Sequence, residues 1–284
     1  MKFEYKKWFL ENPNFKEYWT PNESALWNTS DNEDTFKKHL NKYPKSPHLR
    51  YYIENPITYS FNNYGFRTPD NFNLEEDGNV FLGCSNTFGV GHHLESIWAY
   101  KLSQKIGGKF YNISEPGCGI MTQYRYLNYF KDKIKFKNVF HYLPNEVWGR
   151  YEKINNDDKF EAVYLHNNIS SDLLEFVYND KSLHFITYIF IDSIRYMLNE
   201  IGVNYYLITK SGLTNGIPDP ITGLVSPDPY HPNCIPARDL MHYYVEEHND
   251  IFNMFYHKYL NKITDNTDNV FLINESDCRD VKFI

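Results

Sequence analysis

From residue 79 onward, short apolar runs alternate with amphipathic stretches, and this alternation constrains the fold more than any other feature. Residues 79–84, 109–114, 137–144 and 203–210 are apolar runs of the kind that form buried strands. Residues 95–108, 119–134 and 182–202 carry apolar side chains at helical spacing. Strands that alternate with helices form a parallel sheet with helices on both faces. We therefore expect a three-layer α/β/α sandwich.

The segments around this alternating region have weaker patterns. Residues 1–75 mix aromatic and polar stretches, and we interpret them as an N-terminal extension packed on the core, with short helices and a hairpin around 57–67. Residues 76–284 form the main domain, in which 151–182 is a polar insert or lid and 211–236 is a loop rich in Pro, Gly and Asp. A long helix is expected over 237–263, starting near Asp239, and a last strand over 269–275.

Composition excludes several classes of function. The formal net charge is −7 and the pI is about 5.9, so no basic surface is available and we expect no nucleic-acid partner. Apolar residues make up 42% of the chain, enough for a sizeable core. The four cysteines, Cys84, Cys118, Cys234 and Cys278, form no C-x-x-C pair, which argues against a disulfide framework or a zinc site.

The location of the protein is judged from the absence of targeting signals. No run approaches the roughly 18 consecutive apolar residues of a membrane span, and the first residues lack the apolar core of a signal peptide. We expect a cytoplasmic protein with no membrane partner. The richness in Asn, Lys, Ile, Tyr and Phe is typical of viral or AT-rich microbial genomes, and association with a virion is the alternative location. The oligomeric state is not predicted.

Residues that can take part in a reaction follow the predicted strands. Ser85 comes directly after the first strand, Gly117 lies in the loop after the second, and Asn145 lies in the loop after the third. Asp239 and His242 precede the last long helix. Because loops at the carboxyl ends of parallel strands meet at one edge of the sheet, we expect these residues to lie close together.

This set of residues fits acyl transfer. A serine hydroxyl becomes a nucleophile when a base removes its proton, and His242 is the candidate base, with Asp239 holding its imidazole. The spacing D-x-x-H brings the two side chains within reach of each other. The backbone N–H groups of Ser85 and Gly117 and the amide of Asn145 are the candidate donors of an oxyanion hole.

The four short blocks that hold these residues resemble the SGNH or GDSL hydrolases, a family of esterases, lipases, thioesterases and carbohydrate deacetylases. Residues 81–91 look like the first block, 111–123 the second, 141–146 the third, and 237–242 the D-x-x-H block. The resemblance spans about residues 78–262. It implies a flavodoxin-like fold and a catalytic triad of Ser85, Asp239 and His242. It also implies an oxyanion hole of Ser85, Gly117 and Asn145.

The resemblance further implies a serine esterase that needs neither a cofactor nor a metal. Its expected partner is a small-molecule or glycan ester, either a carbohydrate O-acetyl group or another short-acyl ester. Cys84 and Glu146 replace the aspartates that the family usually has at these positions, and Ser114 replaces a glycine, but none of the three has a catalytic role in the pattern.

Other interpretations remain open. Ser85 and Asp239 are also residue types that cap helices, and Asn145 is typical of turns. Cys84 as the nucleophile and a metal at His92 and His93 are less favoured. The alternative functions are a catalytically silent glycan-binding or structural module of the same fold, and an acyltransferase that uses the same triad.

Overall fold

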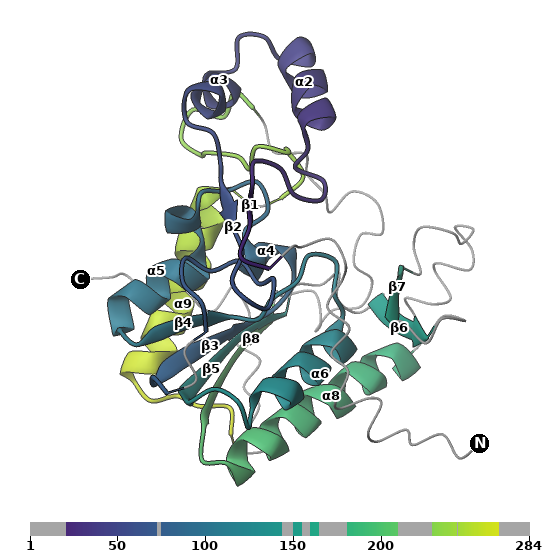
Figure 1. Cartoon of the computed structure of the whole chain (residues 1–284), viewed down its shortest axis with the longest axis vertical. Coiled ribbons are helices and arrows are strands. Elements are labelled where there is room, and N and C mark those ends of the chain that lie inside the picture. The colour runs from purple at the N-terminus through teal and green to yellow at the C-terminus, as the bar shows by residue number, and fades with distance from the viewer. Residues whose placement is uncertain are drawn as a thin grey trace.

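A computed structural model describes residues 21–72, 75–143, 150–154, 160–164, 181–209, 229–242 and 244–266 (Figure 1). Its centre is a four-stranded sheet in which all neighbouring strands run parallel. The strands, in the order in which they lie side by side, are β4 (Lys109–Asn112), β3 (Gly78–Leu82), β5 (Phe136–Leu143) and β8 (Asn204–Thr209). The predicted α/β fold with a parallel sheet is confirmed.

The strands are buried, as their apolar sequences predict. All five residues of β3 are buried, and in β5 only Lys137 is exposed. A strand that is covered on both faces has no solvent side, so its sequence is a continuous apolar run and does not alternate.

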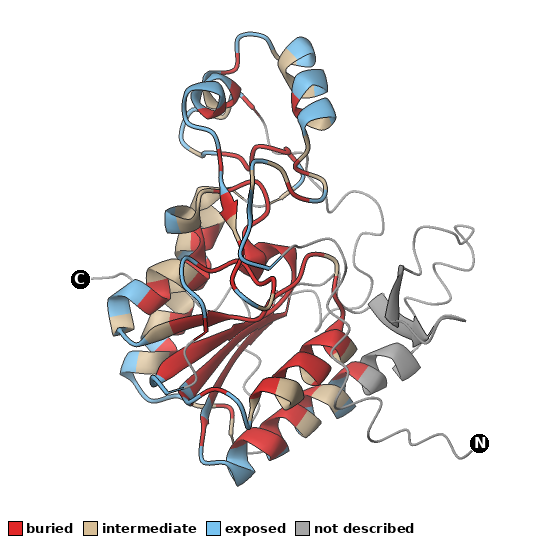
Figure 2. Ribbon diagram, in the orientation of Figure 1, coloured by how far each residue is buried: buried red, intermediate tan, exposed pale blue. Residues whose placement is uncertain are grey.

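Helices cover both faces of the sheet. Val80 and Leu82 of β3 pack in one core cluster with α6 (Ile120–Phe130) and α8 (Lys181–Glu200). Phe81 points to the other face and packs with α5 (Trp98–Ile106) and α9 (Val245–Leu260). Figure 2 shows the buried sheet between these two pairs of helices.

The connections that follow β3 and its neighbouring strands pass over opposite faces of the sheet. Counted along the chain, the sheet strands lie in the order 2-1-3-4. The chain leaves β3 through α4 (Ser85–Phe88), the 3₁₀ turn η1 (Leu94–Ser96) and α5, whereas the connections that follow β4 and β5 pass over the opposite face through α6 and α8. Where connections leave neighbouring strands in opposite directions, a crevice opens at the carboxyl ends of the strands.

The N-terminal segment, defined here as residues 21–72, contains short helices, as its sequence predicts, whereas the hairpin expected around 57–67 is reduced to an isolated bridge. Its helices are α2 (Glu33–Lys42) and α3 (Pro47–Glu54), capped by the side chains of Asn32 and Ser46. Strands β1 (Ser24–Ala25) and β2 (Tyr59–Ser60) pair antiparallel, and an antiparallel bridge joins Phe61 to Arg67. In Figure 1, α2 and α3 extend beyond the end of the sheet where α4 lies.

A third core cluster joins the N-terminal segment to the main domain. Tyr59 and Phe61 stack on the ring of Phe88 in α4, with ring centroids 6.0 and 6.5 Å apart. Val90 and Leu240 belong to the same cluster. The N-terminal segment is therefore packed against the loop after β3 and against the loop that precedes α9.

The last helix begins later than the sequence predicts. Helix α9 starts at Val245, and the carboxylate of Glu247 accepts the Tyr244 N–H at 2.8 Å at its first turn. Asp239 lies in a separate tight turn, in which the Leu240 N–H donates to the carbonyl of Ala237 at 3.0 Å. The positive φ of 51° at Leu240 breaks the helix there. The prediction that the helix starts near Asp239 is therefore wrong.

The predicted insert contains an antiparallel hairpin formed by β6 (Arg150–Ile154) and β7 (Phe160–Tyr164). The predicted strand at 269–275 lies outside the described residues. Among the helices of the described residues, none combines the length and apolarity that crossing a lipid bilayer requires.

Candidate active site

Ser85 lies at a sharp corner between β3 and α4. It is the first residue of the four-residue α4, and only 8% of its surface is exposed. The corner depends on Gly83, because a Cβ atom there would lie 2.0 Å from Thr87 Oγ1 and 3.0 Å from the carbonyl oxygen of Tyr142. The strand therefore turns into the helix with its backbone pressed against β5, and the Ser85 side chain sits at the carboxyl end of the sheet.

The loop after β4 approaches this corner. Gly117 has a φ of 76°, a left-handed conformation that favours glycine. The next residue, Cys118, donates through its thiol to the carbonyl of Gly83 at 3.2 Å. Among the described residues, no acceptor is found for the backbone N–H of Ser85 or of Gly117. Both N–H groups are therefore without a partner in this part of the chain, which a donor to an oxyanion requires.

A directed chain of hydrogen bonds runs from the core to this loop. The Gln123 amide donates to Cys118 Sγ at 3.6 Å, and its oxygen lies 2.5 Å from His141 Nε2. Because an amide oxygen only accepts, Nε2 carries the proton and Nδ1 accepts the Tyr205 hydroxyl at 2.7 Å. Burial lowers the pKa of His141 to about 3. The neutral His141 therefore fixes the direction of every bond up to the Gly83 carbonyl.

The Asp239 and His242 side chains form the pair that the D-x-x-H spacing predicts. His242 Nδ1 donates to Asp239 Oδ2 at 2.7 Å; the carboxylate is fully buried and the imidazole is 17% exposed. Burial raises the pKa of Asp239, but the charge and hydrogen bond of His242, with donors from Ser30 and the Met241 backbone, outweigh it and bring the pKa to about 2. An ionised Asp239 holds the proton on Nδ1, which leaves Nε2 as the basic nitrogen.

The turn that carries this pair is fixed to the loop after Ser85. The Arg238 N–H donates to the Gly91 carbonyl at 2.8 Å. A Cβ atom at Gly91 would lie 2.9 Å from Ala237 Cβ and 3.2 Å from Asp239 Oδ1, and its φ is 76°. Gly91 follows Ser85 by six residues. Only a glycine at this position lets the Asp239 turn approach so closely.

The hydroxyl of Ser85 does not bond to His242 within the described part of the chain. The polar contact of Ser85 Oγ is with Cys84 Sγ, at 3.9 Å. In unliganded enzymes the bond between a nucleophile and its base is often long or poorly aligned and shortens when substrate binds. Asn145, the third predicted oxyanion donor, lies outside the described residues, two positions after the end of β5.

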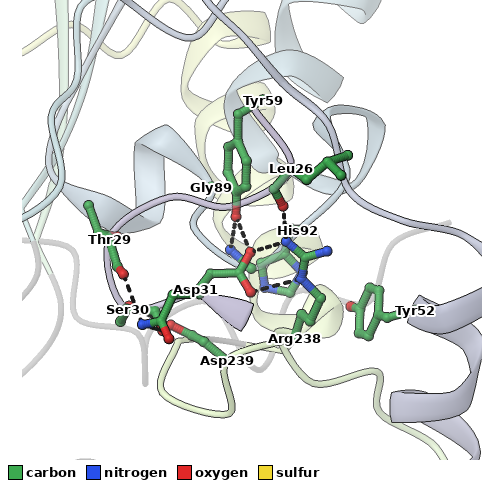
Figure 3. A network of polar contacts seen from close by, with 12 residues as sticks. Leu26, Thr29, Ser30, Asp31, Tyr52, Tyr59, Gly89, His92, Arg238 and Asp239 are labelled. Atoms are coloured by element: carbon green, nitrogen blue, oxygen red, sulfur yellow. Dashed lines mark hydrogen bonds and ion pairs between the residues drawn. The ribbon is translucent and has the colours of Figure 1, made fainter. Parts of the chain in front are cut away.

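The N-terminal segment contributes polar contacts to the site that sequence reasoning missed (Figure 3). Ser30 Oγ donates to Asp239 Oδ2 at 2.6 Å. Asp31 binds Arg238 through two bonds, Nε to Oδ1 at 2.8 Å and Nη2 to Oδ2 at 2.7 Å. The Tyr59 hydroxyl donates to Asp31 Oδ2 at 2.5 Å and accepts the Gly91 N–H at 2.8 Å. No motif in residues 21–72 indicated these contacts.

Arg67 of the same segment binds the backbone of the loop after α4. Its guanidinium donates to the carbonyls of Gly89 at 2.5 Å and His92 at 2.7 Å. The charge lies 4.4 Å from the centre of the Tyr59 ring. Burial lowers the pKa of Arg67 to about 10, which leaves the side chain charged at neutral pH. A buried cation thus holds the carbonyls that follow Ser85.

The other candidate residues have separate surroundings. His92 is buried with its ring edge against His248, at a centroid distance of 4.8 Å, whereas His93 stacks on Tyr52 at 6.0 Å. No group of three or more metal-ligating side chains is found in the described ranges. Cys84 is buried, and Cys84, Cys118 and Cys234 are free thiols.

We compared the chain with protein-family models, curated protein sequences and solved structures, and none of them matched.

Proposed function

We propose that this chain is a serine esterase of SGNH type, with Ser85 as nucleophile, His242 as general base and Asp239 as the residue that orients the imidazole. The strand order 2-1-3-4 is the start of the flavodoxin-like order 2-1-3-4-5, and the resemblance implies that fold. Ser85 and Gly117 follow β3 and β4, two neighbouring parallel strands whose carboxyl ends lie at the same edge of the sheet.

One observation carries the proposal. The pair of a buried Asp239 and a partly exposed His242 is attached through Gly91 to the loop that begins at Ser85. A carboxylate at a pKa of about 2 that bonds to a partly exposed imidazole is the arrangement that a general base needs. A purely structural turn would not require a charged, fully buried acceptor for the histidine.

In the proposed reaction, His242 Nε2 removes the Ser85 proton while Oγ attacks the carbonyl carbon of the ester. The N–H groups of Ser85 and Gly117, together with the Asn145 amide, donate to the oxyanion. His242 then passes the proton to the leaving alcohol as the C–O bond breaks. Water, deprotonated by the same nitrogen, attacks the acyl-serine and releases the acid and a free Ser85.

The substrate proposed is a short-acyl ester, with the O-acetyl group of a carbohydrate as the leading candidate. This choice comes from the resemblance and from aromatic residues of the loops that can stack on a sugar ring, such as Trp148, which lies outside the described residues.

The decisive experiment compares Ser85→Ala with Ser193→Ala on p-nitrophenyl acetate. Ser193 is a partly buried serine on α8, and its hydroxyl donates to the Ile189 carbonyl of its own helix at 2.7 Å. Ser85→Ala is expected to abolish turnover and labelling by a fluorophosphonate probe, and Ser193→Ala to change neither. Wild-type turnover in Ser85→Ala would refute the assignment.

The absence of a bond between Ser85 and His242 in the described residues favours one other function, that of a glycan-binding module without catalysis. That function predicts that the wild-type protein is not labelled by the fluorophosphonate probe but binds acetylated oligosaccharides in a calorimetric titration. If the protein is labelled, product analysis with and without an alcohol acceptor separates hydrolysis from acyl transfer.

A further inference from the structure

One hydroxyl group of the N-terminal segment, that of Ser30, bonds directly to Asp239 of the predicted triad. Ser30 Oγ donates to Asp239 Oδ2 at 2.6 Å, and the same oxygen accepts the His242 Nδ1–H at 2.7 Å. The second oxygen, Oδ1, accepts the Met241 N–H at 3.0 Å. Ser30 is thus the only one of the three donors that comes from outside the D-x-x-H turn, 209 positions away in the sequence.

The backbone around Ser30 is held in one conformation. Asn28 and Asp31 exchange two backbone hydrogen bonds, at 2.8 and 3.1 Å, across a tight turn in which Thr29 has a φ of 53°. The Asn32 amide donates to the carbonyl of Ser30 at 3.1 Å, and its oxygen caps α2. The turn therefore presents the Ser30 hydroxyl in a fixed direction.

Two consecutive residues of this turn bind two consecutive residues of the turn that carries Asp239. Ser30 bonds to Asp239, and Asp31 bonds to Arg238 through both oxygens (Figure 3). The Asp31–Arg238 pair is almost fully buried, so it fixes the distance between the two turns. The Ser30–Asp239 bond is then made without any further loss of freedom in the backbone.

The Ser30 bond has a chemical consequence for Asp239. A buried carboxylate keeps its charge only when its oxygens are hydrogen-bonded, and each donor lowers its pKa. Ser30 is one of the groups that lower the pKa of Asp239 against the effect of burial. Without it, Oδ2 would keep a single donor, and both the charge and the position of the carboxylate would be less well defined.

We propose that Ser30 is a positioning residue of the active site: its hydroxyl, supplied by the N-terminal segment, holds Asp239 in the orientation that keeps the His242 proton on Nδ1. This inference rests on the proposed esterase function. In this role Ser30 acts through its bond to Asp239.

The test compares Ser30→Ala with Ser30→Thr, which keeps a hydroxyl, and with the matched control Ser24→Ala. Ser24 lies in the same segment but is exposed, and its hydroxyl bonds to Ser60 Oγ at 3.2 Å. On p-nitrophenyl acetate, Ser30→Ala is expected to lower kcat by roughly 10- to 100-fold, the range for a hydrogen bond to a charged group, with little change in KM. Ser30→Thr should restore kcat to within a few-fold, and Ser24→Ala should match the wild type.

A second readout does not depend on activity. The His242 Nδ1 proton, bonded to a carboxylate, gives a low-field NMR resonance that His242→Gln identifies by its loss. In Ser30→Ala this resonance should shift upfield and exchange faster with water, whereas Ser30→Thr and Ser24→Ala should keep it.

The two proposals fail in different ways. If the wild-type protein hydrolyses no ester and is not labelled by the fluorophosphonate probe, the esterase function is refuted, and the NMR resonance still decides whether Ser30 holds the pair. If Ser85→Ala abolishes activity but Ser30→Ala keeps both the wild-type kcat and the unchanged resonance, the role of Ser30 is refuted and the esterase remains.

Discussion

Arg238 and Asp31 form an ion pair whose closest atoms lie 2.7 Å apart, and each side chain is only 1% exposed. The guanidinium also lies 4.0 Å from the centre of the Trp27 ring. Burial raises the pKa of Asp31, and the bonds from Arg238 and Tyr59 oppose this effect. Because the pair joins the N-terminal segment to the turn of Asp239, its loss affects both stability and the site.

The first prediction concerns this pair. Asp31→Asn removes the negative charge and leaves the Arg238 cation buried without its partner, which typically costs about 3–5 kcal/mol. A urea titration should show this as a lower midpoint with an unchanged slope. As the control, Glu33→Gln breaks the exposed pair with Lys37, a contact of 2.6 Å, and should leave the midpoint unchanged. Equal midpoints for the two variants would contradict the prediction.

The second prediction concerns the corner before Ser85. In Gly83→Ala the new Cβ meets Thr87 Oγ1 and the carbonyl of Tyr142, so the corner must move. We expect a loss of about 1–3 kcal/mol in unfolding free energy. We also expect the loss of ester hydrolysis and probe labelling, because Ser85 moves with the corner.

Gly202→Ala is the control for that prediction. Its φ of 70° costs about 1–2 kcal/mol for an alanine, but no atom lies within 4 Å of the added Cβ. The two variants should therefore lose similar stability and differ in activity. If Gly83→Ala remained as active as Gly202→Ala, the corner would not position Ser85, the proposed nucleophile.

The third prediction concerns the thiol that joins the second loop to the corner. Cys118→Ser keeps a group that donates to Gly83 and accepts from Gln123, whereas Cys118→Ala removes both bonds. An unsatisfied buried group costs about 1–3 kcal/mol, so the alanine variant should be less stable than the serine variant by that amount. Hydrolysis should fall in the alanine variant alone. Equal stability and activity of the two variants would show that the thiol bonds are unimportant.

The fourth prediction concerns pH. The pKa of His141 is about 3 in the folded protein and 6.5 in the unfolded chain, so between these values the unfolded state binds a proton that the folded state does not. Stability must therefore fall as the pH drops from 6.5 to 3, by on the order of 5 kcal/mol for this group.

Urea titrations at pH 7, 6, 5 and 4 measure this fall in unfolding free energy. Plotted against pH, the unfolding free energy of His141→Gln should have a shallower slope than that of the wild type. His248 is also buried with a lowered pKa, so part of the slope will remain in that variant. An identical slope in the wild type and His141→Gln would mean that His141 is protonated in the folded state.

Some of the site is visible in the sequence because its causes are local. The corner at Ser85 follows an apolar run and is flanked by Gly83, Gly89 and Gly91, residues that tight backbone turns require. The pair of Asp239 and His242 depends on a spacing of three residues, and the two side chains meet as that spacing predicts.

The predicted start of the last helix was wrong for a physical reason. Apolar periodicity continues from residue 237 into α9, but the Asp239 carboxylate accepts the Met241 N–H and the chain turns at Leu240. A side chain that bonds to its own backbone competes with the helix, and periodicity does not record that competition.

The sequence by itself determined the order of strands and helices, the parallel sheet and the loops in which candidate groups lie, because apolar periodicity and turn residues act over short distances along the chain. Tertiary structure alone decided that Ser30, Asp31, Tyr59 and Arg67 surround the loops of Ser85 and Asp239. These contacts join residues from 22 to 209 positions apart and arise from the packing of whole segments. A hydroxyl or carboxylate has the same local sequence signature whether it faces solvent or a buried partner.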